Sequence, residues 1–254
     1  MLRWVHRFRV LSVDQIQRLT ITSGSPATRA RRTRSVLHRL TAYGYLRRLD
    51  RQIGGVHGGS TGTLYRITGR GIGVLADADG TDRRRVGGEP GERYLRHVLA
   101  IGEQAVRLYE LAATTTHAEI VVDEFTPEPG CWRRYPAAHS GTTILRPDAF
   151  VRVHDDAYDT VSFLEQDMAT ESIPTVLRKC RAYIDYWRSG IEQTRTGIFP
   201  RVVWAVPDDR RADRVSGALS RLPADARHLF VVQAGIVADL LTGRSDEPTG
   251  EVSS

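Results

Sequence analysis

Three acidic residues in the middle of the chain, Asp148, Glu165 and Asp167, have the chemistry and spacing of a cation-binding site. Two apolar, β-rich runs, I-L-R-P-D-A-F-V-R-V and T-V-S-F-L-E-Q-D-M-A, flank an acidic turn at 155–158, which is typical of a β-hairpin. Asp148 would begin the first strand, and Glu165 and Asp167 would project from one face of the second, because they are two residues apart. Three carboxylates gathered across one hairpin repel one another unless a cation lies between them. Hard oxygen ligands of this kind suit Mg²⁺ or Mn²⁺.

A solvated sheet edge is the alternative interpretation of these acids, because Asp and Glu are mostly surface residues. Phe163 and Leu164 directly precede Glu165 and favour a buried strand, in which an acid is costly without a partner. The residues alone leave both interpretations open.

Lys179 is the only lysine among the 36 Lys and Arg residues, and it falls on a helix expected over 173–189. An ammonium is a compact charge whose pKa can be shifted, whereas a guanidinium stays protonated. Beside the acids it would hold an attacking water or stabilise the pentavalent phosphorane of a phosphodiester hydrolysis. Tyr183, four residues later, would share its helix face. A surface lysine without a chemical role is the alternative.

The first 76 residues and the rest of the chain have net charges of opposite sign. Residues 1–76 contain 14 arginines against Asp14 and Asp50, which gives +12; since the whole chain carries +6, the remainder carries −6. A basic N-terminal module predicts a polyanionic partner.

The N-terminal 76 residues have the order of elements found in a winged helix-turn-helix module. Apolar residues at helical spacing predict a first helix over 2–11, and the capping-box pattern S-V-D-Q from Ser12 predicts a second helix through Leu19. A third helix is expected to begin at Pro26 or Thr28 and to end at Gly44, which would supply a left-handed C-cap.

The third helix and the wing carry the residues predicted to bind DNA. Two short β-runs, 45–53 and 63–68, flank a glycine-rich tip at 54–62 and would form the wing. In this arrangement the third helix enters the major groove while arginines hold backbone phosphates. The predicted DNA contacts are Arg29, Arg31, Arg32, Arg34, His38, Arg47, Arg48 and Arg51. A winged-helix module used only for protein contacts is the alternative.

A connector rich in Gly, Asp and Arg, over 77–92, separates this module from a second predicted domain over 93–243. Helix, three strands, helix and strand follow one another in that domain. This order predicts an α/β (α+β) fold, with a mixed sheet and helices on its faces. The polar tail at 244–254 is expected to be disordered.

Membrane and secreted classes do not fit the sequence. It has no run of 18 consecutive apolar residues, so a membrane span is not expected. The basic N-terminus, M-L-R-W-V-H-R-F-R-V, lacks an apolar signal-peptide core. Cys131 and Cys180 have neither metal-ligand spacing nor a disulfide framework, which favours a reducing cytoplasm.

The second domain resembles the restriction-endonuclease-like PD-(D/E)xK nuclease superfamily. P-D at 147–148 matches the first element of that motif, and E-Q-D at 165–167 matches the second except for its final lysine. In some branches of the superfamily the next helix supplies the lysine, and Lys179 is the candidate here. The implied catalytic set is Asp148, Glu165, Asp167, Lys179 and Tyr183, with Asp148, Glu165 and Asp167 as ligands of Mg²⁺ or Mn²⁺.

The whole chain resembles the actinobacterial replication-relaxation family, which pairs an N-terminal winged helix with a domain of this type. The stretches L-R-P-D-A, F-L-E-Q-D and K-C-R-A-Y carry the resemblance, which covers roughly residues 10–240. It implies a role in replication or mobilisation of plasmids or integrative elements. The implied partners are double-stranded DNA and other replication or mobilisation proteins.

Three functions remain open at this stage. The protein would be a DNA-binding accessory factor whose second domain is a scaffold or forms a homodimer, or a Mg²⁺-dependent nuclease whose winged helix chooses the site. It would otherwise be a transcription regulator with a degenerate nuclease fold. We favour DNA binding in a mobile element, with nicking or cleavage as an additional activity.

Overall fold

The computed structural model describes residues 1–49, 62–80, 88, 90–115, 120–136, 141–155 and 158–243. The chain divides into two compact units, Met1–Val106 and Arg107–Ser254. Arg51, most of the predicted wing tip, part of the connector and the tail at 244–254 lie outside the described residues. Each unit is considered separately below.

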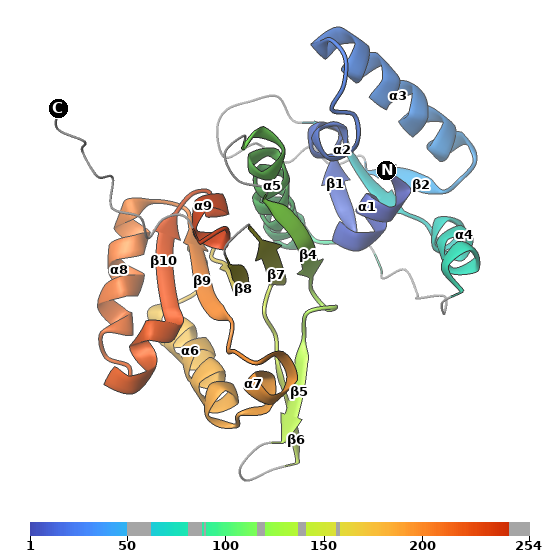
Figure 1. The fold of residues 1–254 in the computed structure, drawn as a ribbon. Helices are drawn as coiled ribbons and strands as arrows, with labels where there is room; N and C mark the ends of the chain where they lie inside the picture. The colour runs from blue at the N-terminus through green and yellow to red at the C-terminus, as the bar shows by residue number, and fades with distance from the viewer. Residues whose placement is uncertain are drawn as a thin grey trace, which may run out of the picture. The chain divides into compact units, whose positions relative to one another are not determined.

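The first unit is built on a three-stranded antiparallel sheet in which β3 lies between β1 and β2 (Figure 1). Its elements are α1 (Leu2–Phe8), β1 (Val10–Ser12), α2 (Val13–Thr20), α3 (Pro26–Ala42), β2 (Leu46–Leu49), β3 (Leu64–Ile67), α4 (Gly69–Asp79) and the first part of α5 (Glu92–Thr114). Apart from β1, α4 and α5, this is the order of elements expected for a winged helix-turn-helix.

Local hydrogen bonds explain where these helices begin. The Ser12 hydroxyl accepts from the Gln15 N–H at 3.1 Å, and the Gln15 side chain accepts from the Ser12 N–H at 3.2 Å, so the predicted capping box is confirmed. Ser25 caps α3, and Pro26 takes the first helical position. Gly44, with φ +70°, follows the end of α3 as predicted.

The predicted first helix over 2–11 was too long. It ends at Phe8, where Arg9 takes φ +66°, and Val10 to Ser12 form β1. Val10 and Leu11 pair with β3 and are buried, so their apolar character serves a sheet rather than a helix face. Tertiary pairing here overrides the helical spacing.

Residues 77–79, predicted to open the connector, belong to α4. Gly71 lies inside this helix because a Cβ there would come within 2.3 Å of the Tyr45 carbonyl oxygen. Gly71 therefore permits a close approach of α4 to the chain before β2.

Helix α5 begins at Glu92, and the boundary between the two units falls inside it. Its N-terminal part packs against the small sheet through Leu95 and Val98. Arg18 of α2 donates to Glu103 at 2.8 Å, which fastens this part of α5 to the first unit.

The second unit contains a five-stranded mixed sheet in the order β10-β9-β8-β7-β4. β4, β7 and β8 are antiparallel neighbours, whereas β8, β9 and β10 run parallel. Together with the last part of α5, its elements are β4 (Val121–Pro127), β5 (Arg133–Pro136), β6 (Thr142–Leu145), β7 (Ala149–His154), β8 (Asp159–Gln166), α6 (Ile173–Arg188), α7 (Ile191–Thr196), β9 (Arg201–Val206), α8 (Asp209–Leu219), the 3₁₀ helix η1 (Ala224–Leu229), β10 (Phe230–Ala234) and α9 (Ala238–Leu241). The mixed sheet and the order helix, three strands, helix and strand are confirmed, with the β5–β6 hairpin inserted between the first two strands (Figure 1).

The apolar run from Ile144 belongs to two strands instead of one. Ile144 and Leu145 end β6, which pairs with β5, and β7 begins only at Ala149. Pro147 lies between them and has no N–H to continue a ladder. This break places Asp148 immediately before β7, as expected.

A buried cluster joins α6 to the sheet and fixes the position of the predicted site. Phe163 of β8, Trp204 of β9, and Cys180 and Tyr183 of α6 belong to this cluster. In the described part of the chain, no helix combines the length and the apolar character needed to cross a bilayer.

Candidate functional site

The three predicted acids are buried. Asp148 is 7%, Glu165 1% and Asp167 4% exposed, so the solvated-edge interpretation is wrong. β8 lies between β7 and β9, and Glu165 pairs in register with Trp204 of β9. A carboxylate at such a position requires partners.

Helix α6 supplies both partners of Glu165. The Lys179 ammonium donates to Glu165 Oε2 at 3.1 Å, and the Tyr183 hydroxyl donates to Oε1 at 2.5 Å. These two residues are four positions apart, so one face of the helix presents both groups. Lys179 also lies 3.3 Å from Glu171, and its Nζ is 5.7 Å from the centre of the Trp204 ring. The predicted approach of Lys179 to the acidic strand is confirmed.

Asp148 lies beside the end of β8. Its main-chain N–H donates to the Leu164 carbonyl at 3.0 Å, and its Oδ2 accepts from the Gln166 N–H at 2.7 Å. Burial, followed by the charge of Asp148, raises the pKa of Glu165 to about 7, although Lys179 and Tyr183 oppose that shift. Near neutral pH, the protonated and ionised forms of Glu165 therefore have similar free energies.

The pKa of Lys179 is raised, so its ammonium stays protonated. Burial on its own lowers this pKa, but the charges of Glu165, Asp148 and Glu171 together outweigh burial. Lys179 is therefore a permanent cation beside the carboxylates of Glu165, Asp148 and Glu171.

Asp167 has a different partner. Arg211 of α8 contacts its Oδ2 with Nε at 2.7 Å and Nη2 at 2.6 Å, and Asp167 Oδ1 accepts from the Ala169 N–H at 2.6 Å. β8 ends at Gln166, so side-chain alternation no longer places Asp167 with Glu165. Among the described residues, no group of three or more His, Cys, Asp or Glu side chains is arranged to hold a metal ion. The structure brings Asp148 and Glu165 together and ties Asp167 into an ion pair.

Asp148 and Glu165 are the residues that would hold the Mg²⁺ or Mn²⁺ ion expected from the sequence. Mg²⁺ is commonly held by one or two carboxylates with several waters, so two buried acids suffice in number and kind. Burial and then the charge of Asp148 raise the pKa of Glu165, and a cation would relieve the repulsion between the two carboxylates. Both Glu165 oxygens already accept hydrogen bonds, so a cation there would rearrange the contact with Lys179 or Tyr183.

Sequence reasoning did not find Glu171 or Arg211. Arg211 is one of many arginines, and nothing in its spacing indicates that it alone on α8 is buried against an acid. It also donates to the Glu171 carbonyl at 2.8 Å, so it fastens the segment between β8 and α6. That segment determines where α6 begins.

Another buried acid, Glu192 of α7, serves the scaffold. Arg133 of β5 donates to Glu192 at 3.1 Å, and the Tyr186 hydroxyl donates to the same oxygen. The Arg133 guanidinium also lies over the Phe150 and Phe163 rings, at 4.8 and 5.4 Å. These contacts attach the β5–β6 hairpin to the sheet and to α7.

In the first unit, α3 presents the predicted DNA contacts. This helix of 17 residues buries only Thr33 and Leu37. Six predicted contacts on α3 and β2 are exposed: Arg31, Arg32, Arg34, His38, Arg47 and Arg48. Arg29 is half-buried and donates to the Thr22 carbonyl at 3.4 Å. From Gln15 to Ala76 the only acid in the sequence is Asp50, so this surface is strongly basic.

Comparison with known families gives one result. The family profile of replication-relaxation proteins matches residues 2–202, which include α3, Asp148, Glu165 and Lys179. No curated protein and no solved structure matches the chain.

Proposed function

Because the chain belongs to the replication-relaxation family, we propose that it binds double-stranded DNA during replication or mobilisation of a plasmid or integrative element. The observation that carries this proposal is α3, which buries two side chains and leaves an arginine-rich face exposed. A helix used only for packing would bury a wider apolar stripe.

The spacing of arginines on the exposed face of α3 supports a helix that enters the major groove. Arg31, Arg34 and His38 follow the i, i+3, i+7 spacing and so form one stripe along the helix. Arginine forks match the guanine edge in the major groove, while the neighbouring arginines of β2, Arg47 and Arg48, suit backbone phosphates.

Fluorescence anisotropy with a labelled duplex tests this proposal. We expect the double variant Arg31→Glu, Arg34→Glu to weaken binding at least tenfold and to flatten the salt dependence, because phosphate contacts release counterions. The matched control is Arg210→Glu, Arg214→Glu, which changes the net charge equally on the exposed face of α8. Equal losses in both double variants would show a net-charge effect and remove α3 from the interface.

Metal-dependent DNA nicking is the second candidate function, and the contact between Lys179 and Glu165 favours it. Asp148 and Glu165 would hold the Mg²⁺, which would supply an activated water and positive charge at the phosphate. Lys179 would place its ammonium against the charge that develops on the phosphoryl oxygens. Tyr183 would fix the orientation of Glu165 through its hydrogen bond.

Nicking of supercoiled plasmid, with Mg²⁺, Mn²⁺ and a chelator side by side, tests this second function. Lys179→Met should abolish nicking and leave duplex binding unchanged, and Lys179→Arg should also be poor. Duplex binding without metal-dependent nicking in the wild type would identify an accessory factor or transcription regulator with a degenerate nuclease fold.

A further inference from the structure

We propose that Tyr43 stacks on an unpaired nucleobase beside the duplex, so that the first unit recognises a junction between double- and single-stranded DNA. This inference rests on the DNA binding proposed above and adds the class of DNA that the surface prefers.

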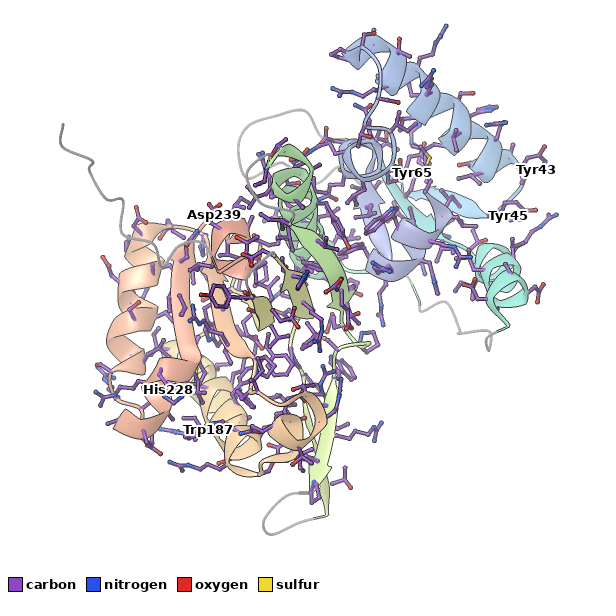
Figure 2. The ribbon with its side chains drawn as sticks, in the orientation of Figure 1. Tyr43, Tyr45, Tyr65, Trp187, His228 and Asp239 are labelled. Carbon is purple, nitrogen blue, oxygen red and sulfur yellow. The ribbon has the colours of Figure 1, made fainter. Side chains whose placement is uncertain are left out.

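Tyr43 is an exposed aromatic ring on a rigid support. It follows the last residue of α3, is 59% exposed, and its ring centre lies 5.9 Å from that of Tyr45 at an interplanar angle of 35°. Gly44, with φ +70°, turns the chain between the two rings. Figure 2 labels Tyr43 and Tyr45. The Arg70 guanidinium lies 5.4 Å from the centre of the Tyr45 ring.

Tyr45, against which the Tyr43 ring lies, is itself held by further contacts. Tyr45 is half-buried, and its carbonyl accepts from the Thr68 N–H at 3.0 Å. The Tyr45 ring contacts both the Arg70 guanidinium and the Tyr43 ring. Tyr43 contacts one aromatic neighbour, Tyr45, and most of its side chain faces solvent. Its ring is therefore accessible to a planar ligand that would stack on it.

The surroundings of Tyr43 select a nucleic acid as that ligand. Arg39, Arg47 and Arg70 are exposed close to it in sequence or in space, and no described acid lies between Gln15 and Ala76. Aromatic rings among arginines bind single strands, since the ring stacks on a base while the arginines follow the phosphates. Tyrosine and arginine are also common at protein interfaces. A surface with this excess of positive charge requires a partner rich in negative charge, and DNA is the polyanion proposed above.

An unpaired base, rather than a paired one, is the expected ligand. Bases inside a duplex already stack on both faces, so a tyrosine ring can reach a base face only at an end, a gap or a fork. Nine residues separate Arg34 from Tyr43, which is about 14 Å along a helix and about four base pairs of duplex. The unpaired base should therefore lie about four base pairs from the bases that Arg34 contacts.

Two DNA substrates test the inference with the full-length protein. One is a blunt duplex; the other is the same duplex with a single-stranded extension that carries 2-aminopurine at its first unpaired position. We expect the wild type to prefer the extended substrate about tenfold and to quench 2-aminopurine, because one stacked base contributes about that much. A series of extensions that moves the junction by single base pairs should give its maximum within the span derived above.

Variants at position 43 separate stacking from other contacts. Tyr43→Ala should lose the preference and the quenching while binding the blunt duplex normally. Tyr43→Phe should keep both, because the ring alone stacks. Tyr158→Ala, at a tyrosine of the second unit that is 74% exposed, is the matched control and should behave as wild type.

Three results would overturn the inference: equal wild-type affinity for both substrates, an equal loss on both substrates in Tyr43→Ala, or a loss in Tyr43→Phe as large as in Tyr43→Ala. The last would mean that the phenol hydroxyl bonds a phosphate. If the wild type bound neither substrate, the proposed DNA binding would fail as well. Intact duplex binding without a junction preference would remove this inference alone.

Discussion

Glu165 should make the second unit less stable as the pH rises from 5 to 8. Its side chain is 1% exposed, and burial, followed by the charge of Asp148, raises its pKa from 4.5 to about 7. An acid with a higher pKa in the folded state stabilises the fold fully below its unfolded pKa. That contribution is lost as the pH rises through the folded value. At about 1.36 kcal/mol per pKa unit the whole effect is about 3 kcal/mol, of which about 2.5 kcal/mol falls between pH 5 and 8.

Urea unfolding of the wild type and of Glu165→Gln, at pH 5 and at pH 8, isolates this effect. In a Trp4→Phe background, the remaining tryptophans all report on the second unit: Trp132, Trp187 and Trp204. The free energy of unfolding of the wild type, minus that of the variant, should be about 2.5 kcal/mol larger at pH 5 than at pH 8.

Glu171→Gln provides the control for the pH experiment. It removes the other carboxylate that contacts Lys179, at 3.3 Å, and leaves Glu165 buried. This variant should keep the pH dependence of the wild type. A difference between wild type and Glu165→Gln that does not change with pH would refute the reasoning, because Lys179 would then hold Glu165 fully ionised in the fold.

Three further predictions concern metal, the buried ion pair and chain packing. Millimolar Mn²⁺ should raise the melting temperature of the wild type. The increase should be larger at pH 8 than at pH 6, because the cation must displace the Glu165 proton. Asp148→Asn should reduce the increase, whereas the control Asp209→Asn, at an exposed carboxylate, should not. Arg211→Met should destabilise the second unit by about 3–5 kcal/mol in urea unfolding, since it leaves Asp167 buried without its partner, whereas Arg210→Met should be nearly neutral. Gly71→Ala should cost at least about 1 kcal/mol in thermal unfolding because its Cβ would meet the Tyr45 carbonyl; Gly69→Ala, with nothing within 4 Å, is the control, and equal stability of the two would refute the close approach.

Signals that are local in sequence predicted local structure well. The Ser12–Gln15 capping box, the start of α3 near Pro26 and the left-handed Gly44 each follow from one or two residue types at fixed positions. The mixed sheet followed from the alternation of apolar runs with helical ones. These features depend little on distant parts of the chain, which is why pattern alone predicts them.

Features that depend on distant partners were missed. β1 exists because Val10 and Leu11 find β3, more than 50 residues later in the chain. The last three residues of α4, 77–79, were assigned to the connector because of their Gly-, Asp- and Arg-rich surroundings, and only the Tyr45 carbonyl explains Gly71. The partner of Asp167 is Arg211, 44 positions away. In a chain with so many arginines, composition cannot single out that one.

The Asp167–Arg211 pair also explains the departure from the nuclease motif that the sequence resembles. The motif places a lysine where Asp167 stands, but Asp167 turns to α8 and helps hold the segment that leads into α6. Positive charge reaches Glu165 from α6 instead, through Lys179. An arginine at position 179 would bring a larger, planar guanidinium into a space bordered by Trp204 and Glu171. The lysine ammonium is compact and needs less room there. The single lysine of an arginine-rich chain therefore occupies the one described position where a compact cation meets a buried carboxylate, and this coincidence is the strongest reason to test the cluster for chemistry.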